Sequence, residues 1–248
     1  MHSLLKVLLI GFLAGATTTI GGILAVLFKP RETFLVTGLG FSSGVMLGVT
    51  FLLLIPKALA AGYWLCFWGF LSGTAFMFFF DMLLPHRHIL ENEEGLSDDA
   101  LALRKVGIMA TIGIAIHDFP EGLALGAGFG VLNTFGFVLA LGIALHNVPE
   151  GIAISLPLYH SGLSRTKSAL AAAATDIPTI LGAILAYLLG RIFTGSFMFA
   201  LLAFAGGSMF YITMDELVPE AHKYGKGFYV TLGLLAGIMT AFLLTLLA

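Results

Sequence analysis

Eight long apolar stretches make up almost the whole chain, and they limit its fold more than any other feature. Each is long enough to cross about 30 Å of hydrocarbon as a helix. A helix pairs its own backbone N–H and C=O groups, as the absence of water in lipid requires. Charged residues make up 10% of the 248 residues, against about 25% in soluble domains. The sequence predicts an all-α polytopic membrane protein with one transmembrane domain over residues 1–248. The predicted spans are residues 3–28, 34–56, 63–84, 106–127, 133–157, 168–190, 196–218 and 227–247.

The Lys and Arg residues predict how these spans are oriented. The acidic stretch 85–105 has the composition of a solvated loop. Placing it in the cytoplasm puts nine basic residues inside and three outside, namely Lys6, Lys57 and Arg191. An excess of Lys and Arg on the cytoplasmic side is typical of membrane proteins. We therefore expect a multi-pass protein of the plasma membrane, such as a bacterial inner membrane, with both termini outside.

Two copies of one motif lie in the middle of adjacent spans. IGIAIHDFPEGLAL begins at Ile112 and LGIALHNVPEGIAI begins at Leu141, and eight of the 14 aligned positions are identical. Ionisable residues near the bilayer centre cost roughly 2.5 kcal/mol or more and usually mark functional sites. Because the two spans run in opposite directions, the motif predicts inverted-repeat symmetry, which is typical of transporters with a site at mid-depth.

The motif places polar side chains on one stripe of each helix, because positions i, i+1 and i+4 lie within about 100° of one another. The residues on the two stripes are His117, Asp118 and Glu121, and His146, Asn147 and Glu150. Pro120 and Pro149 leave the carbonyls four residues earlier without a helical donor. Imidazole with carboxylate and amide oxygens suits zinc, iron(II), manganese and similar ions. Alternatively, these side chains pair with each other and only hold the two helices together.

The doubled HxxPEG motif, with eight spans and external termini, resembles the ZIP (Zrt-, Irt-like protein) family of divalent-metal transporters. The similarity is strongest to bacterial members without a His-rich loop, and it covers the whole chain. It implies a metal site between spans 106–127 and 133–157, with the six residues above as ligands. It also implies that Met46, in SSGVMLGVTF, borders this site. Without the resemblance, Met46 is an ordinary core residue.

Further His and acidic residues lie at the predicted inner ends of two spans, in the stretches DMLLPHRH and MDELVPEAH. The resemblance implies that residues of this kind line the path by which metal leaves. The residues predicted there are Asp81, His86, His88, Asp215 and Glu216, together with Asp176 of span 168–190. The alternative is that they form ordinary solvated helix ends.

Two positions depart from the pattern of many ZIP relatives. Asp118 stands where they have Asn, and Thr179 stands where they have the Glu that completes a second metal position. One carboxylate is gained where another is lost, so the formal charge of the site is unchanged. We therefore expect Asp118 to supply the carboxylate that is missing at position 179.

These features predict transport of divalent metal ions into the cytoplasm, with zinc as the main substrate and iron, manganese, cobalt or cadmium as further ones. The metal is then a substrate, and we expect neither a cofactor nor an enzymatic activity. The predicted partners are metal ions, the lipid bilayer and, by resemblance, a second copy of the chain, but no nucleic acid. The alternative is an intramembrane zinc-dependent hydrolase, although the sequence lacks the HExxH motif of zincins.

Overall fold

A computed structural model describes residues 2–83, 96–193 and 195–248. Within these residues every regular element is a helix, and eight helices or chains of helices are long and apolar enough to cross a membrane. The all-α polytopic class predicted from the sequence is therefore confirmed. Six spans are single helices: α1 (His2–Phe28), α4 (Tyr63–Leu83), α5 (Asp98–Val131), α6 (Asn133–His160), α7 (Arg165–Ile192) and α10 (Gly227–Thr245).

The helix α5 begins at Asp98, eight residues before the predicted start of its span. The Ser97 hydroxyl accepts a hydrogen bond from the Ala100 amide at 3.3 Å, and Asp98 and Asp99 occupy the first turn, where acidic residues stabilise a helix. The solvated loop is therefore shorter than predicted, and most of the remainder falls in residues 84–95, outside the described part of the chain. Both α5 and α6 continue unbroken through their motif prolines.

The second and seventh spans are each built from three consecutive helices. The second contains α2 (Glu32–Gly48), the π-helix η1 (Val49–Leu54) and α3 (Ile55–Leu59). The seventh contains α8 (Ser196–Ile212), the π-helix η2 (Thr213–Leu217) and α9 (Val218–His222). In both, a proline follows the π-helix, and the amide before that proline binds the carbonyl five residues back, at Thr50 or Thr213. Turns of this kind are frequent at functional sites.

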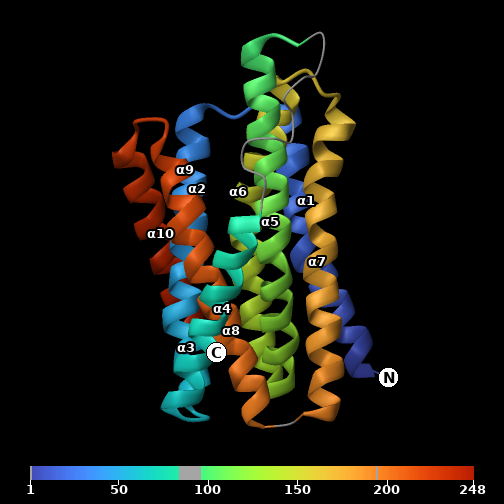
Figure 1. Cartoon of the computed structure of the whole chain (residues 1–248), viewed down its shortest axis with the longest axis vertical. Helices are drawn as coiled ribbons and strands as arrows, with labels where there is room; N and C mark the ends of the chain where they lie inside the picture. The colour runs from blue at the N-terminus through green and yellow to red at the C-terminus, as the bar shows by residue number, and fades with distance from the viewer. Residues whose placement is uncertain (1, 84–95, 194) are drawn as a thin grey trace.

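These two compound spans are copies of each other in sequence as well as in shape. Residues 41–58 and 204–221 are identical at seven of 18 aligned positions, including Met46 with Met209 and Thr50 with Thr213. They run in opposite directions along the bundle, so η1 and η2 lie toward opposite ends (Figure 1). The inverted relation that the sequence predicts for α5 and α6 therefore has a counterpart in this second pair.

The helices form two groups that lie side by side in Figure 1. One group contains α1, α5, α6 and α7, and the other contains α2, α4, α8 and α10 with the short helices attached to them. Glycines allow backbones to touch within each group, because a Cβ at Gly151 would collide with the Thr18 carbonyl and a Cβ at Gly44 with the Leu234 carbonyl. Close approach at small residues is the usual way in which helices associate in lipid.

Candidate metal centre

The two motif copies meet in the middle of the bundle, where α5 and α6 pack against each other. All six predicted ligands are completely buried, with no side chain reaching solvent or lipid: His117, Asp118, Glu121, His146, Asn147 and Glu150. Charged and imidazole groups are almost never buried to this extent without a partner. Their arrangement therefore decides what the centre can bind.

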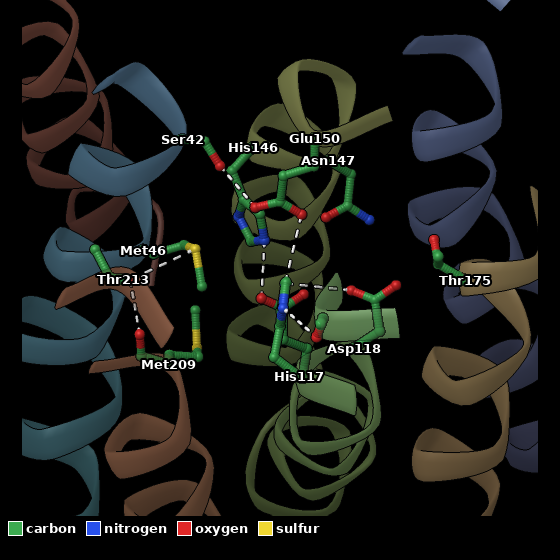
Figure 2. A network of polar contacts seen from close by, with 12 residues as sticks. Ser42, Met46, His117, Asp118, His146, Asn147, Glu150, Thr175, Met209 and Thr213 are labelled. Carbon is green, nitrogen blue, oxygen red and sulfur yellow. Dashed lines mark hydrogen bonds and ion pairs between the residues drawn. The ribbon is translucent and has the colours of Figure 1, made fainter. Parts of the chain in front are cut away.

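His117 presents one ring nitrogen to the centre and uses the other to fix its orientation. Its Nδ1 lies 3.2 Å from the Gly113 carbonyl, which can only accept, so the proton is on Nδ1. In the neutral ring the lone pair is then on Nε2, which lies 3.5 Å from both Asp118 Oδ1 and Glu150 Oε2 (Figure 2). One ligand atom from each of these three residues lies within 4.8 Å of the others. A hydrogen-bonded imidazole of this kind is typical of metal ligands.

His146 and Glu121 form the second contact between the two helices. His146 Nε2 lies 2.9 Å from Glu121 Oε1, and both side chains are fully buried. The alternative in which the motif side chains pair with each other and only hold the two helices together would include this pair. The contact involves one nitrogen of His146 and one oxygen of Glu121. The other two atoms, His146 Nδ1 and Glu121 Oε2, have no hydrogen-bond partner among the described residues.

Two neighbouring helices orient the remaining ligands. The Ser42 hydroxyl of α2 donates to Glu150 Oε1 at 2.7 Å. The Asn147 amide donates to the Ala14 carbonyl of α1 at 3.4 Å, which leaves its Oδ1 oxygen without a partner. Sequence reasoning missed Ser42, because an isolated serine in an apolar helix carries no signal of what lies opposite.

Unpartnered polar atoms are concentrated at this centre. Those among the described ligand residues are His117 Nε2, both Asp118 oxygens, Glu121 Oε2, His146 Nδ1, Asn147 Oδ1 and Glu150 Oε2. Leaving a buried polar group unpaired costs about 1–3 kcal/mol, and more when the group is charged. The atoms comprise two imidazole nitrogens and five oxygens, a mixed set that zinc accepts. The centre is therefore suited to a divalent cation.

Two methionines line the side of the centre that faces the α2/α4/α8/α10 group. Met46 and Met209 are buried, and the Thr213 hydroxyl donates to the Met209 carbonyl at 2.7 Å and lies 3.6 Å from Met46 Sδ. Figure 2 shows both methionines on the side of His146, whereas Asp118 and Asn147 extend toward α7. Sequence reasoning missed Met209, although the alignment of residues 41–58 with 204–221 places it opposite Met46.

Three of the acids predicted for the release path gather between α4, η2 and α5. The Tyr211 hydroxyl donates to Asp81 Oδ2 at 3.2 Å, and the charges of Asp215 and Glu216 also act on Tyr211. The Glu216 carboxylate packs against Gly113, one helical turn from His117. His86 and His88 lie outside the described residues.

Asp176 does not join that cluster, and the structure places it between α1 and α7 instead. Its Oδ2 accepts a hydrogen bond from the Thr19 hydroxyl at 2.6 Å, and its Cβ would lie 3.3 Å from a Cβ at Gly15. Thr179, one turn further along α7, is buried and its hydroxyl has no hydrogen-bond partner among the described residues. The Thr179 carbonyl faces Gly122, the residue after Glu121, so position 179 lies against α5 without contributing a carboxylate.

Comparisons with known proteins find zinc transporters that match most of the chain in sequence. The sequence profile of the family described as ZIP Zinc transporter matches residues 84–245. The chain is 38% identical to the zinc transporter ZupT of Chlorobium phaeovibrioides, with 96% of each chain covered. It is 34% identical to the ZupT of Clostridium perfringens, covering 96% of this chain and 94% of the relative. The ZupT of Escherichia coli O127:H6 is 35% identical, over 93% of this chain and 92% of the relative.

Proposed function

We propose that this chain, which belongs to the ZIP zinc transporter family, carries zinc ions through the bacterial inner membrane into the cytoplasm. The family is one of transporters and not of enzymes, so the hydrolase alternative gains no support. Zinc is then the substrate that passes through the protein. Iron, manganese, cobalt and cadmium are further candidate substrates, because geometry and not ligand type separates these ions.

The observation that carries this proposal is the buried cluster of His117, Asp118 and Glu150. A cation among them would bind one atom of each residue. It would thereby give His117 Nε2 and the carboxylate oxygens the partner that they lack. Zinc is held by His at about 2.0–2.1 Å and by carboxylate oxygen at about 2.0–2.2 Å. The ligand atoms, which lie within 4.8 Å of one another, would therefore have to draw closer around a bound zinc ion.

Glu121 and His146 are proposed to give up their contact with each other and to bind the metal instead. In the present arrangement they pair at 2.9 Å, and each retains one free atom. An arriving cation would compete with the His146 ring for Glu121. When the His146–Glu121 contact breaks, the cation would pair with the buried Glu121 charge. Met46 would add a thioether on the side of His146, and Asn147 an amide oxygen on the side of α7.

The proposed exit leads from His117 past Glu216 to Asp81 and Asp215. Glu216 is well placed for the first step, because its carboxylate packs one turn from His117. The basic residues support the direction: Lys29 and Arg165 both interact with the Tyr159 hydroxyl at this end of the bundle. At the other end, Lys6 donates to Asn133 at 3.0 Å. The external termini and a homodimer remain predictions, as does a single domain over residues 1–248.

Zinc uptake into proteoliposomes tests the proposal. His117→Ala and Glu150→Ala should each lower uptake at least about tenfold, or roughly 1.4 kcal/mol, because each removes a ligand from a water-free centre. Ser208→Ala is the matched control, since Ser208 is equally buried but binds the Gly73 carbonyl away from the centre. Wild-type uptake by both ligand variants would refute the site. Peptide hydrolysis without any metal uptake would favour the hydrolase instead.

A further inference from the structure

An apolar groove made of two adjacent cavities runs along the boundary between the two helix groups. Its deeper part has a volume of about 450 Å³ and is lined by residues of α2, α6 and α10, including Gly38 and Pro149. A second part, of about 410 Å³, continues it toward the turn between α1 and α2. The two parts share the lining residues Phe34, Val148 and Ile152, so they lie next to each other along the same face.

The length of this groove matches one leaflet of a bilayer. It extends along α2 from Arg31 to Phe41, and ten residues of helix rise about 15 Å. Half of a hydrocarbon core about 30 Å thick is also about 15 Å. Gly38 has no side chain to occupy the groove, and a Cβ there would lie 3.3 Å from the Pro149 Cβ. The groove therefore has the length and the apolar lining that a single acyl chain requires.

A positive charge stands at the end of the groove that faces the membrane surface. Arg31 lines this end and is exposed, and no carboxylate among the described residues pairs with it. In contrast, the neighbouring Glu32 is already bound by Lys226 at 2.6 Å. Lys29 adds a second positive charge nearby and interacts with Tyr159. The groove thus combines an apolar channel with a basic mouth, a combination that binds anionic lipid headgroups between transmembrane helices.

We propose that this groove binds one anionic phospholipid, with an acyl chain along Phe34, Val148 and Ile152 and its phosphate at Arg31. The lipid would fill the boundary between the two helix groups on the outer side of α6. There it would contact Pro149, the residue directly before the predicted ligand Glu150. This inference concerns a second binding site and does not rest on zinc transport, so it can fail or succeed independently.

Native mass spectrometry of the purified full-length chain tests the headgroup. Phosphatidylglycerol and phosphatidylcholine are offered separately at equal concentration, and the fraction of protein that retains lipid is measured. We expect retention of one phosphatidylglycerol. Arg31→Gln should lower that fraction roughly fivefold, which corresponds to about 1 kcal/mol for one basic residue near anionic lipid. Lys167→Gln is the matched control, because Lys167 is an exposed basic residue that does not line the groove.

A second pair of variants tests the acyl channel. Ala236 is exposed and lines the groove, so Ala236→Phe should fill it and expel the lipid without disturbing helix packing. Leu235→Phe adds an aromatic ring next to it but outside the groove, and should leave retention unchanged. Equal retention of both lipids by the wild type would overturn the proposal, as would normal retention by Arg31→Gln and Ala236→Phe. A dimer that Ala236→Phe dissociates, with lipid retention unchanged, would assign the groove to a second copy of the chain and would also overturn it.

Discussion

Packing inside each four-helix group differs from packing between the groups. Inside the α1/α5/α6/α7 group, helix backbones touch, as at Gly151, where a Cβ would collide with the Thr18 carbonyl. The α2/α4/α8/α10 group repeats this pattern, and a Cβ at Gly44 would collide with the Leu234 carbonyl. Backbone contacts of this kind cannot adjust by rotating a side chain. Each group is therefore expected to move as one unit.

Between the groups, the glycines face side chains. A Cβ at Gly38 would lie 3.3 Å from the Pro149 side chain, and a Cβ at Gly142 would lie 3.0 Å from Val49. The Gly113 backbone similarly faces the flexible carboxylate of Glu216. Because the Val49 and Glu216 side chains can rotate, and the Gly38–Pro149 contact is longer than the backbone contacts, this interface can shift at lower cost than either interior. The metal centre belongs to the first group, so a shift would move the whole centre relative to Met46, Met209 and Glu216.

The largest expected effect separates these two kinds of contact. Gly151→Ala forces α1 and α6 apart, and we expect it to destabilise the protein by about 3 kcal/mol, the upper range for overpacking. For a chain of this size, that corresponds to a melting temperature lowered by roughly 6–12 °C. Thermal unfolding of the detergent-purified protein, followed by circular dichroism, measures the change.

Gly38→Ala provides the comparison, because its new methyl meets only the Pro149 side chain, which can shift by a few tenths of an ångström. Its melting temperature should stay close to that of the wild type. If both variants unfold at the same temperature, the two kinds of interface do not differ in rigidity, and the two-group description loses its basis.

A second prediction concerns the distribution of negative charge within the α1/α5/α6/α7 group. Asp118→Asn should lower zinc occupancy and uptake about tenfold, or roughly 1.4 kcal/mol, because it removes a charge from a buried centre where ions interact more strongly than in water. Thr179→Glu should restore part of this loss in the double variant. Metal stoichiometry and uptake, with expression matched, complete the double-mutant cycle.

Two results would contradict the exchange of carboxylates between α5 and α7. One is a silent Asp118→Asn variant. The other is a double variant in which Thr179→Glu restores nothing, although the protein folds normally. In either case Asp118 lines the centre without holding the ion, and His117 and Glu150 would carry the binding.

The sequence was sufficient for the fold class because hydropathy alone determines how many helices can cross a membrane. The spans were located to within a few residues, except at α5, where Ser97 and two acidic residues begin the helix in a segment with the composition of a loop. The two groups could not be predicted. They depend on which glycines face backbone and which face side chains, and this is settled only when the helices are packed.

The motif was enough to predict a candidate site, but most residues outside the motif that contact this site were not predicted. His117, Asp118 and Glu150 do converge, because both copies face the same contact between α5 and α6. Ser42 and Met209 come from helices far away in the sequence, and neither belongs to the motif. Asp176 was also predicted for the release path, and the structure shows that Thr19 of α1 donates a hydrogen bond to it. Charge indicates that a buried residue needs a partner and does not indicate which one.

The third prediction concerns a carboxylate of the other group. Glu216→Gln should lower uptake about fivefold, or roughly 1 kcal/mol, while zinc affinity of the centre is unchanged, since Glu216 lies one turn from His117 and outside the ligand cluster. Glu220→Gln is the control, because Glu220 pairs with Lys223 at 2.5 Å at the exposed end of the helix. A parallel loss of zinc affinity in Glu216→Gln would place Glu216 in the centre itself, and no loss of uptake would remove it from the exit path.

The smallest expected effect belongs to the one hydrogen bond that joins a predicted ligand to the other group among the described residues. Ser42 donates to Glu150 at 2.7 Å across the boundary, whereas Ser43, equally buried, donates to the Leu39 carbonyl of its own helix. Ser42→Ala should lower zinc affinity about threefold, since a net hydrogen bond contributes about 0.5–1.5 kcal/mol and the bound cation compensates part of the loss. Ser43→Ala removes a hydroxyl of the same size without touching Glu150, so isothermal titration with zinc should give the wild-type affinity. Equal effects of the two variants would mean that the contact between the groups does not orient Glu150, and the ligand would then be positioned by α6 alone.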